Sequence, residues 1–212
     1  MRIAILGAGN VGGALGGRFV AAGHEVVYGI PDPQGEKTQN LLRRLGAGAS
    51  AGTVAEAAGS AELIVLATPW GVTRAALEEA GGLGGKVVVD CTNPLKMEAG
   101  GLTLTLGFDT SGAEQVAEWA RGARVVKAFN QTGAANMADP HYAGGRGVMF
   151  VCGDDEPARA AVMRLVEETG FEAVDAGPLR SARLLEPLAM LWIHLAFTTD
   201  LKQNFAFSLL RR

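Results

Sequence analysis

The sequence has few of the features that mark secreted, membrane or metal-binding proteins. Only two cysteines occur among 212 residues, Cys91 and Cys152. They are too few for a disulfide framework or an all-cysteine zinc site, so buried free thiols are expected. No stretch approaches the roughly 18 apolar residues of a membrane span, and Gly7 ends the first apolar run too early for a signal peptide. We therefore expect a cytoplasmic protein with no metal and no membrane partner.

Charge of one sign is also scarce, because the formal net charge is only -3. No basic stretch is long enough to neutralise a run of phosphates, which excludes nucleic acid as an expected partner. Apolar residues make up 48% of the chain, so a folded domain is expected rather than disorder. A small molecule is the expected partner.

Short apolar runs alternate with helical segments through the first half of the chain. This order predicts an α/β fold, a Rossmann-type doubly wound parallel sheet with helices on both faces. Beyond about residue 130 the pattern is less regular. We expect a dinucleotide-binding domain at 1–130 and a small C-terminal α/β lobe at 131–212. The runs that fit buried strands are 2–6, 25–28, 63–67, 86–90, 124–128, 148–152 and 172–175.

Gly7, Gly9 and Gly12 have the spacing G-x-G-x-x-G, directly after the first expected strand and at the start of a helix. The first glycine permits a tight turn, the second lets the backbone approach a pyrophosphate, and the third lets the helix pack close to the strand. The alternative is a tight strand–helix turn without a ligand. The setting in a strand–helix–strand unit favours dinucleotide binding.

Three further expected strands end in polar, proline or aromatic residues. The segments are Thr68-Pro69-Trp70, Asn93-Pro94 and Phe129-Asn130. Ligands in open parallel sheets bind outside the carboxyl ends of the strands, so we expect these segments to line one cleft. The alternatives are a packed loop aromatic for Trp70 and an ordinary turn for Asn93-Pro94.

A catalytic acid–base group is missing from the sequence. His24 and His194 fit structural positions, and His141, in a polar loop, is only a weak candidate. We therefore predict no catalytic residue. The absence favours hydride transfer between two cofactors, since an alcohol oxidation needs a group to take the hydroxyl proton.

With these residues in view, the chain resembles the deazaflavin-dependent NADP oxidoreductases, which reduce or oxidise coenzyme F420 with NADP(H). The resemblance covers nearly the whole length. It rests on Gly7–Gly12, Ala67–Trp70, Val151–Asp155 and Asp175–Glu186, of which the last two are the more specific.

The resemblance implies direct ring-to-ring hydride transfer between NADP(H) and a deazaflavin or flavin-like acceptor in a cleft. It implies cofactor-binding positions at the turn, after the second strand and at the three strand ends. These positions are Gly7, Ala8, Gly9, Asn10, Val11, Gly12, Ile30, Pro31, Thr68, Pro69, Trp70, Asn93, Pro94, Leu95, Ala128, Phe129 and Asn130.

The sequence departs from the family at Ile30 and Pro31, where relatives tend to carry a Ser-Arg pair that grips the 2′-phosphate of NADP. Neither the acid of an NAD site nor the Arg of an NADP site is present. Lys37 is the candidate to replace that pair, unless it belongs to a solvated helix face, and NAD is not excluded.

The acceptor stays open as well, because the oxidoreductase domain of the STEAP metalloreductases uses the same fold with other partners. Two alternative functions remain. One is a non-catalytic NADP(H)-binding or sensing protein. The other is a small imine or hydroxyacid dehydrogenase, for which the chain leaves little room.

Two C-terminal features have structural interpretations. Asp154 and Asp155 fit a helix cap better than a metal site, because no third ligand lies near them in sequence. The apolar density from Leu179 onward, including Met190–Trp192, fits core or a subunit contact, so a homodimer through the C-terminal helices is expected.

Overall fold

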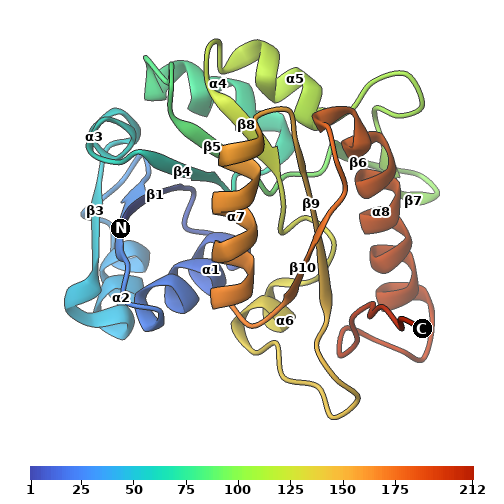
Figure 1. The fold of residues 1–212 in the computed structure, drawn as a ribbon. Helices are drawn as coiled ribbons and strands as arrows, with labels where there is room; N and C mark the ends of the chain where they lie inside the picture. Colours follow the sequence, from blue (N-terminus) through green and yellow to red (C-terminus); the bar gives the residue numbers. More distant parts are fainter.

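The computed structural model describes residues 1–212 and contains one large twisted sheet (Figure 1). The strand order is β10-β9-β8-β5-β4-β1-β2-β3, and all pairs from β3 to β8 are parallel. This arrangement confirms the predicted doubly wound fold. The strands are β1 (Arg2–Leu6), β2 (Glu25–Gly29), β3 (Ala49–Gly52), β4 (Leu63–Leu66), β5 (Val87–Asp90), β8 (Arg124–Lys127), β9 (Val148–Gly153) and β10 (Glu172–Asp175).

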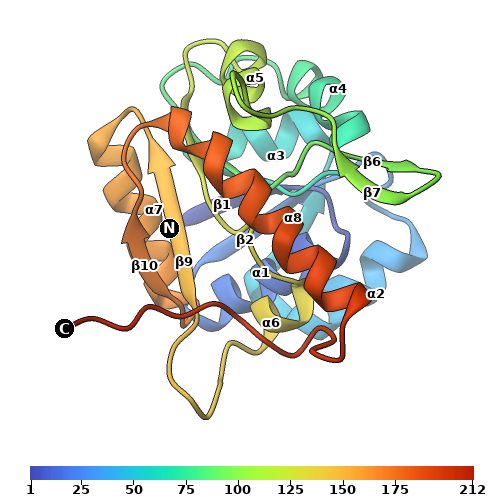
Figure 2. The same cartoon turned by 90° about the vertical axis from the view of Figure 1, so that its right-hand side faces the viewer.

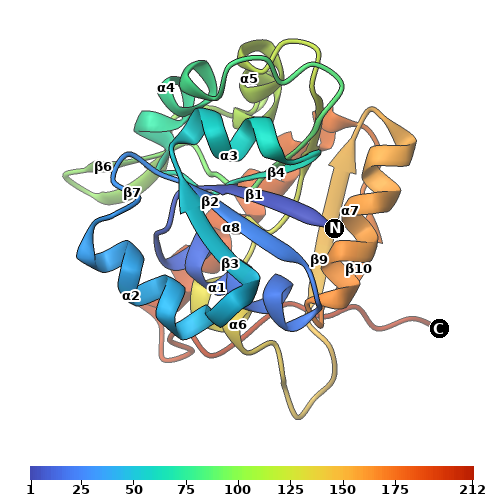
Figure 3. The same ribbon diagram turned by 90° about the vertical axis from the view of Figure 1, so that its left-hand side faces the viewer.

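Helices cover both faces of the sheet, which is why its central strands are apolar without interruption. In β1, Ile3 and Ile5 pack with the helices on one face of the sheet, whereas Ala4 and Leu6 pack with the helices on the other face. Figure 3 shows α1 and α2 on one face and α3 on the other. The first group is α1 (Asn10–Ala21), α2 (Glu36–Leu45), α6 (Ala134–Ala138) and α7 (Glu156–Glu168); the second is α3 (Val54–Ser60), α4 (Trp70–Ala80) and α5 (Gly112–Trp119).

The sheet continues past residue 130, because β9 pairs with β8. This pairing is antiparallel and joins only Val126 with Gly153 and Lys127 with Cys152. The rest of β9, with β10 beside it, therefore extends beyond the carboxyl ends of the parallel strands. The division into 1–130 and 131–212 stays a prediction, although the two parts share one sheet.

Helix α8 (Ala182–Thr198) crosses the carboxyl ends of the strands, as Figure 2 shows. It begins on the α5 side, where Ala182 and Leu185 enter the core, and ends toward α6 and α2. None of the helices has the length and apolar character that a membrane crossing requires.

Two other sequence predictions are confirmed. Cys91 and Cys152 are buried free thiols. Asp155 caps α7 by accepting a hydrogen bond from the backbone N–H of Ala158.

Three elements escaped the sequence analysis. They are β3, whose Ala-Ser-Ala-Gly sequence carries no apolar run, the hairpin of β6 (Leu95–Glu98) and β7 (Gly101–Leu104), and the short helix α6. Each is short, and tertiary contacts rather than local pattern stabilise such segments.

Candidate functional site

The glycine turn between β1 and α1 is built by close approach of backbone to backbone. Gly7 has φ +103°, which favours glycine, and a Cβ there would lie 2.7 Å from the carbonyl oxygen of Ala67. A Cβ on Gly12 would lie 2.1 Å from the carbonyl oxygen of Gly7. These two glycines are therefore required by packing, as the sequence predicted.

Gly9 differs from its two neighbours in the motif. A Cβ there would meet no protein atom within 4 Å, and the backbone conformation (φ -73°) suits any residue. Gly9 is the N-cap of α1, and the first turn has neither a side-chain cap nor an acidic residue. The amide N–H groups at this helix end are left for an acceptor from outside the chain.

The turn opens on a cavity of about 1280 Å³. Residues of α1, α2, α6, α8 and the ends of β5 and β8 line it, including the predicted Ala8, Gly9, Asn10, Val11, Lys37, Asn93, Phe129 and Asn130. Arg18, Lys37 and Arg44 are the cations of the lining, which contains no aspartate, glutamate or histidine. The lining therefore favours an anionic ligand.

The other predicted positions lie outside this lining. Gly7 and Gly12 pack against the backbone of Ala67 and of Gly7, respectively, and Leu95 begins the hairpin β6–β7. Ala128 is fully buried, and Thr68 bonds to Thr73 at the start of α4. Pro69 is the N-cap of α4, and Pro94 lies beneath Gly112.

Trp70 was expected to line the cleft, but it is not among the residues that line the cavity. It begins α4, and its ring lies 5.2 Å from that of Trp119 on α5, centroid to centroid. A Cβ on Gly112 would lie 3.2 Å from the Trp70 ring. Trp70 thus adopts the alternative arrangement, a packed aromatic beside the second group of helices.

Ile30 and Pro31, directly after β2, offer no side-chain donor for a phosphate. Ile30 is 7% exposed and packs inward, and Pro31 has no N–H. The chain then turns back, with the Thr38 hydroxyl donating to the carbonyl oxygen of Asp32. Two cations of α2, Lys37 and Arg44, line the cavity. Lys37 lies in the first turn of the helix and is therefore the closer of the two in sequence to the segment after β2.

Phe129 bends the chain as it leaves β8. It has φ +59°, a left-handed conformation that costs roughly 1–2 kcal/mol in a residue with a Cβ. Its fully buried ring packs edge-on against Phe19, which offsets that cost. Strained residues cluster at binding sites, and this one turns the next residue, Asn130, toward the cavity.

Asn93 and Asn130 form a reciprocal pair at the carboxyl ends of β5 and β8. The Asn93 amide donates to the carbonyl oxygen of Asn130 (2.9 Å), and the Asn130 amide donates to Asn93 Oδ1 (3.0 Å). The Asn130 amide also donates to the carbonyl oxygen of Leu185 on α8 (3.1 Å). These bonds leave both side chains with little freedom to rotate.

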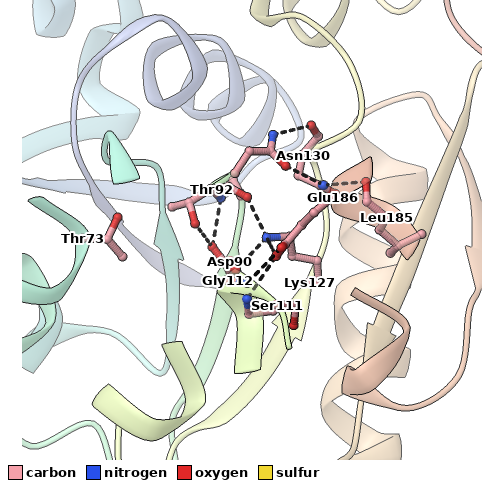
Figure 4. Close-up of polar contacts among 12 residues, drawn as sticks. Thr73, Asp90, Thr92, Ser111, Gly112, Lys127, Asn130, Leu185 and Glu186 are labelled. Carbon is pink, nitrogen blue, oxygen red and sulfur yellow. Dashed lines mark hydrogen bonds and ion pairs between the residues drawn. The ribbon is translucent and has the colours of Figure 1, made fainter. Parts of the chain in front are cut away.

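Beneath this pair lies a buried ion cluster (Figure 4). The Lys127 ammonium, fully buried, donates to Asp90 Oδ2 (2.9 Å), Glu186 Oε1 (2.8 Å) and the carbonyl oxygen of Thr92 (2.6 Å). Burial lowers the pKa of Lys127, but the attraction of Asp90 and Glu186 outweighs burial and raises that pKa above its usual value. Lys127 therefore stays charged at physiological pH.

This ion cluster is the part of the site that the sequence analysis missed. Asp90 and Lys127 each end a run of buried valines, and a charge at such a position is the signal that could have been used. Glu186 lies in an apolar helix and gave no comparable signal of which cation it would meet.

None of the histidines lines the cavity. His24 lies between the N-terminal amine and Glu168, and His141 pairs with Asp139 in an exposed loop. His194 is on α8 and exposed. The cavity therefore offers no imidazole for proton transfer.

Comparison with known proteins agrees with this geometry. Residues 2–94 match the family model described as NADP oxidoreductase, coenzyme F420-dependent. The chain is also 32% identical over 213 residues to the F420-dependent NADP reductase of Methanothermobacter marburgensis, with 92% of each chain covered. The chain belongs to the F420-dependent NADP oxidoreductase family. By family it is an NADP-dependent oxidoreductase, which confirms the resemblance seen in the sequence.

Two further relatives differ in the acceptor that their names imply. The crystal structure of a proposed F420-dependent NADP reductase from Arthrobacter sp. FB24 superposes with a TM-score of 0.91, at 35% identity and 100% coverage of both chains. Rat metalloreductase STEAP3 is 33% identical over 189 residues, which cover 89% of this chain and 36% of STEAP3. The chain thus spans about a third of that relative's length. The family alone does not identify the acceptor.

We predict that alanine destabilises the protein to different extents at two glycines of the turn. Gly12→Ala should lower the free energy of unfolding by about 1–3 kcal/mol or more, because its Cβ would overlap the Gly7 carbonyl. Gly9→Ala, whose Cβ enters open space, should lower it by no more than about 1 kcal/mol. Urea denaturation measures both, and equal losses would contradict the assigned roles.

Proposed function

We propose that this protein transfers a hydride between NADP(H) and a deazaflavin of the F420 type, or a flavin-like acceptor, directly from ring to ring. The observation that carries the proposal is the cavity itself, in a chain of this family. The glycine turn opens into it, three cations line it, and no carboxylate or histidine does.

The residues present fit a dinucleotide. Gly9 leaves the backbone open to a pyrophosphate, and the uncapped start of α1 would attract its charge. The cavity exceeds the roughly 300–1,000 Å³ typical of a pocket for one small molecule, which leaves room for a second ring.

The far end of the cavity would orient the rings. Asn93 and Asn130 are held by each other, and Phe129 by burial, so their positions are fixed before a ligand binds. Trp192 and Ile193 of α8 also line the cavity. When both cofactors are bound, they supply the hydride donor and the hydride acceptor.

Proximity is the main contribution expected of the protein, because this transfer needs no base in contact with the reacting carbon atoms. The thiol of Cys91 lines the cavity, but burial raises the pKa of Cys91 and keeps it neutral. An imine or hydroxyacid dehydrogenase would instead need an acid–base group beside the reacting carbon atoms, and no histidine or carboxylate lines the cavity. The solved imine reductases share 22% identity or less with this chain and show only the fold.

Turnover of purified protein with NADPH and F420, and separately with FMN and FAD, tests the proposal through the nicotinamide absorbance. We expect turnover with at least one acceptor.

Gly9→Ala should weaken NADPH binding in calorimetry by about tenfold or more, because its Cβ would occupy the pyrophosphate's place. Tight NADPH binding without turnover would support a binding or sensing protein, and an absence of binding would overturn both.

Lys37 is proposed to read the 2′-phosphate, because Ile30 and Pro31 cannot. Lys37→Ala should weaken NADPH binding by about tenfold, the size of one charge-assisted hydrogen bond, and leave NADH binding unchanged. Arg43→Ala is the matched control, since Arg43 lies on the same helix outside the cavity lining. An equal loss for both cofactors would show that Lys37 does not discriminate between them.

A homodimer through α8 is also proposed. Leu184 and Leu191 are 72% and 47% exposed, and with the half-buried Leu188 and Leu195 they form an apolar stripe with spacings of four, three and four residues. Size-exclusion chromatography with light scattering should give a dimer mass, and Leu191→Glu should shift it to monomer. A monomer mass for the wild type would rule this dimer out.

A further inference from the structure

Helix α8 is hydrogen-bonded to the sheet and to α5 near its start, and it borders the cavity farther along, where Trp192 packs against Gly133 and donates to the carbonyl oxygen of Phe205. Its polar attachments Arg183, Leu185 and Glu186 lie near its start. Its cavity-lining residues begin at Trp192, which lies about 9 Å farther along the helix at 1.5 Å per residue. A small change of angle at the start of α8 would therefore move the cavity wall.

Glu186 makes the most constrained of these attachments. It is 1% exposed, and both of its carboxylate oxygens are fully engaged. Oε1 accepts hydrogen bonds from Lys127 and from the backbone N–H of Ala113, and Oε2 accepts one from the backbone N–H of Gly112. One side chain thus joins α8 both to the start of α5 and to the end of β8 (Figure 4).

The same cluster also fixes the cavity floor. Lys127 holds the carbonyl oxygen of Thr92, and Asp90 Oδ1 accepts hydrogen bonds from the backbone N–H and the hydroxyl of Thr92. The next residue is Asn93, whose partner Asn130 bonds to the carbonyl oxygen of Leu185, the residue before Glu186. Floor and wall are therefore held by adjacent residues of one helix turn.

We propose that Glu186 and Lys127 are positioning residues that set the distance between the α8 wall and the Asn93–Asn130 floor. They would thereby set the spacing of two rings bound between wall and floor. This inference rests on the proposed function, in which two ligands share the cavity. Neither residue lines the cavity, so both act through Asn93, Asn130 and the α8 backbone.

A second ion pair between the same two helices provides the matched control. Arg183 of α8 binds Glu114 of α5 (2.6 Å), but both side chains are partly exposed and have no bond to the cavity floor. Arg183→Gln loosens the contact of α8 with α5 and leaves the buried cluster intact.

The test compares Glu186→Gln with Arg183→Gln. A glutamine at 186 has one acceptor oxygen where Glu186 has two, so Lys127 or the start of α5 loses its partner. We expect kcat to fall on the order of 10²-fold, the scale of a misplacement of about 1 Å. The KM for NADPH should change less than about threefold, and the deuterium isotope effect on kcat should rise. Arg183→Gln should keep kcat within about twofold.

Hydrogen exchange gives a readout that does not depend on turnover. Amides of residues 92–95, 128–132 and 190–197 should exchange faster in Glu186→Gln than in the wild type, and not in Arg183→Gln. Exchange confined to 112–114, or a kcat loss equal in the two variants, would overturn the proposal. If the wild type turns over no acceptor, the exchange result still decides whether Glu186 couples wall and floor.

Glu186→Asp covers the case in which Glu186→Gln does not fold. The aspartate keeps the negative charge but is one methylene too short to reach Lys127 and the start of α5 together. It should fold and show the same exchange pattern with a smaller kcat loss. Wild-type kinetics and exchange in this variant would also overturn the proposal.

Discussion

The geometry of the cleft depends on the contacts of the buried Lys127 ammonium with Asp90, Thr92 and Glu186. A buried charge is tolerated only when it is paired and hydrogen-bonded, and this one has three acceptors, two at the end of β5 and one on α8. Removing one partner of such a cluster typically costs about 3–5 kcal/mol. The sheet, α5 and α8 must therefore meet at this point for the fold to be stable, and the cavity lies directly beside it.

The two ends of the site thus have different physical bases. At the glycine turn, the absence of side chains lets α1 approach β1 and leaves backbone N–H groups free, so the turn suits any dinucleotide. At the other end, the amide side chains of Asn93 and Asn130 are held by each other and by the backbone of α8, and in the proposed function they orient a second ring. The first is common to many folds, whereas the second depends on how α8 crosses this particular sheet.

Much of the fold could be predicted from the sequence, and eight of the eighteen expected cofactor-binding positions line the cavity. The alternation of apolar strands and helices, with Gly7–Gly12 at its head, is local information and was confirmed. Trp70 shows what local sequence does not reveal. The sequence placed it correctly after a strand, but Trp119, almost fifty residues later, provides the surface on which its ring packs. No local pattern identifies a partner at that separation.

The sequence by itself determined where backbone must approach backbone, because glycine is required wherever a Cβ would collide, as at Gly7 and Gly12. It also contains no recognisable acid–base motif, which is why no catalytic residue is predicted. Only the tertiary structure decided which charges meet. Asp90, Lys127 and Glu186 are separated by tens of residues. Asp90 and Lys127 meet because β5 pairs with β8, and Glu186 reaches Lys127 because α8 crosses the ends of these strands. Electrostatic contacts act over a few ångströms, so the folded chain alone brings these three groups together.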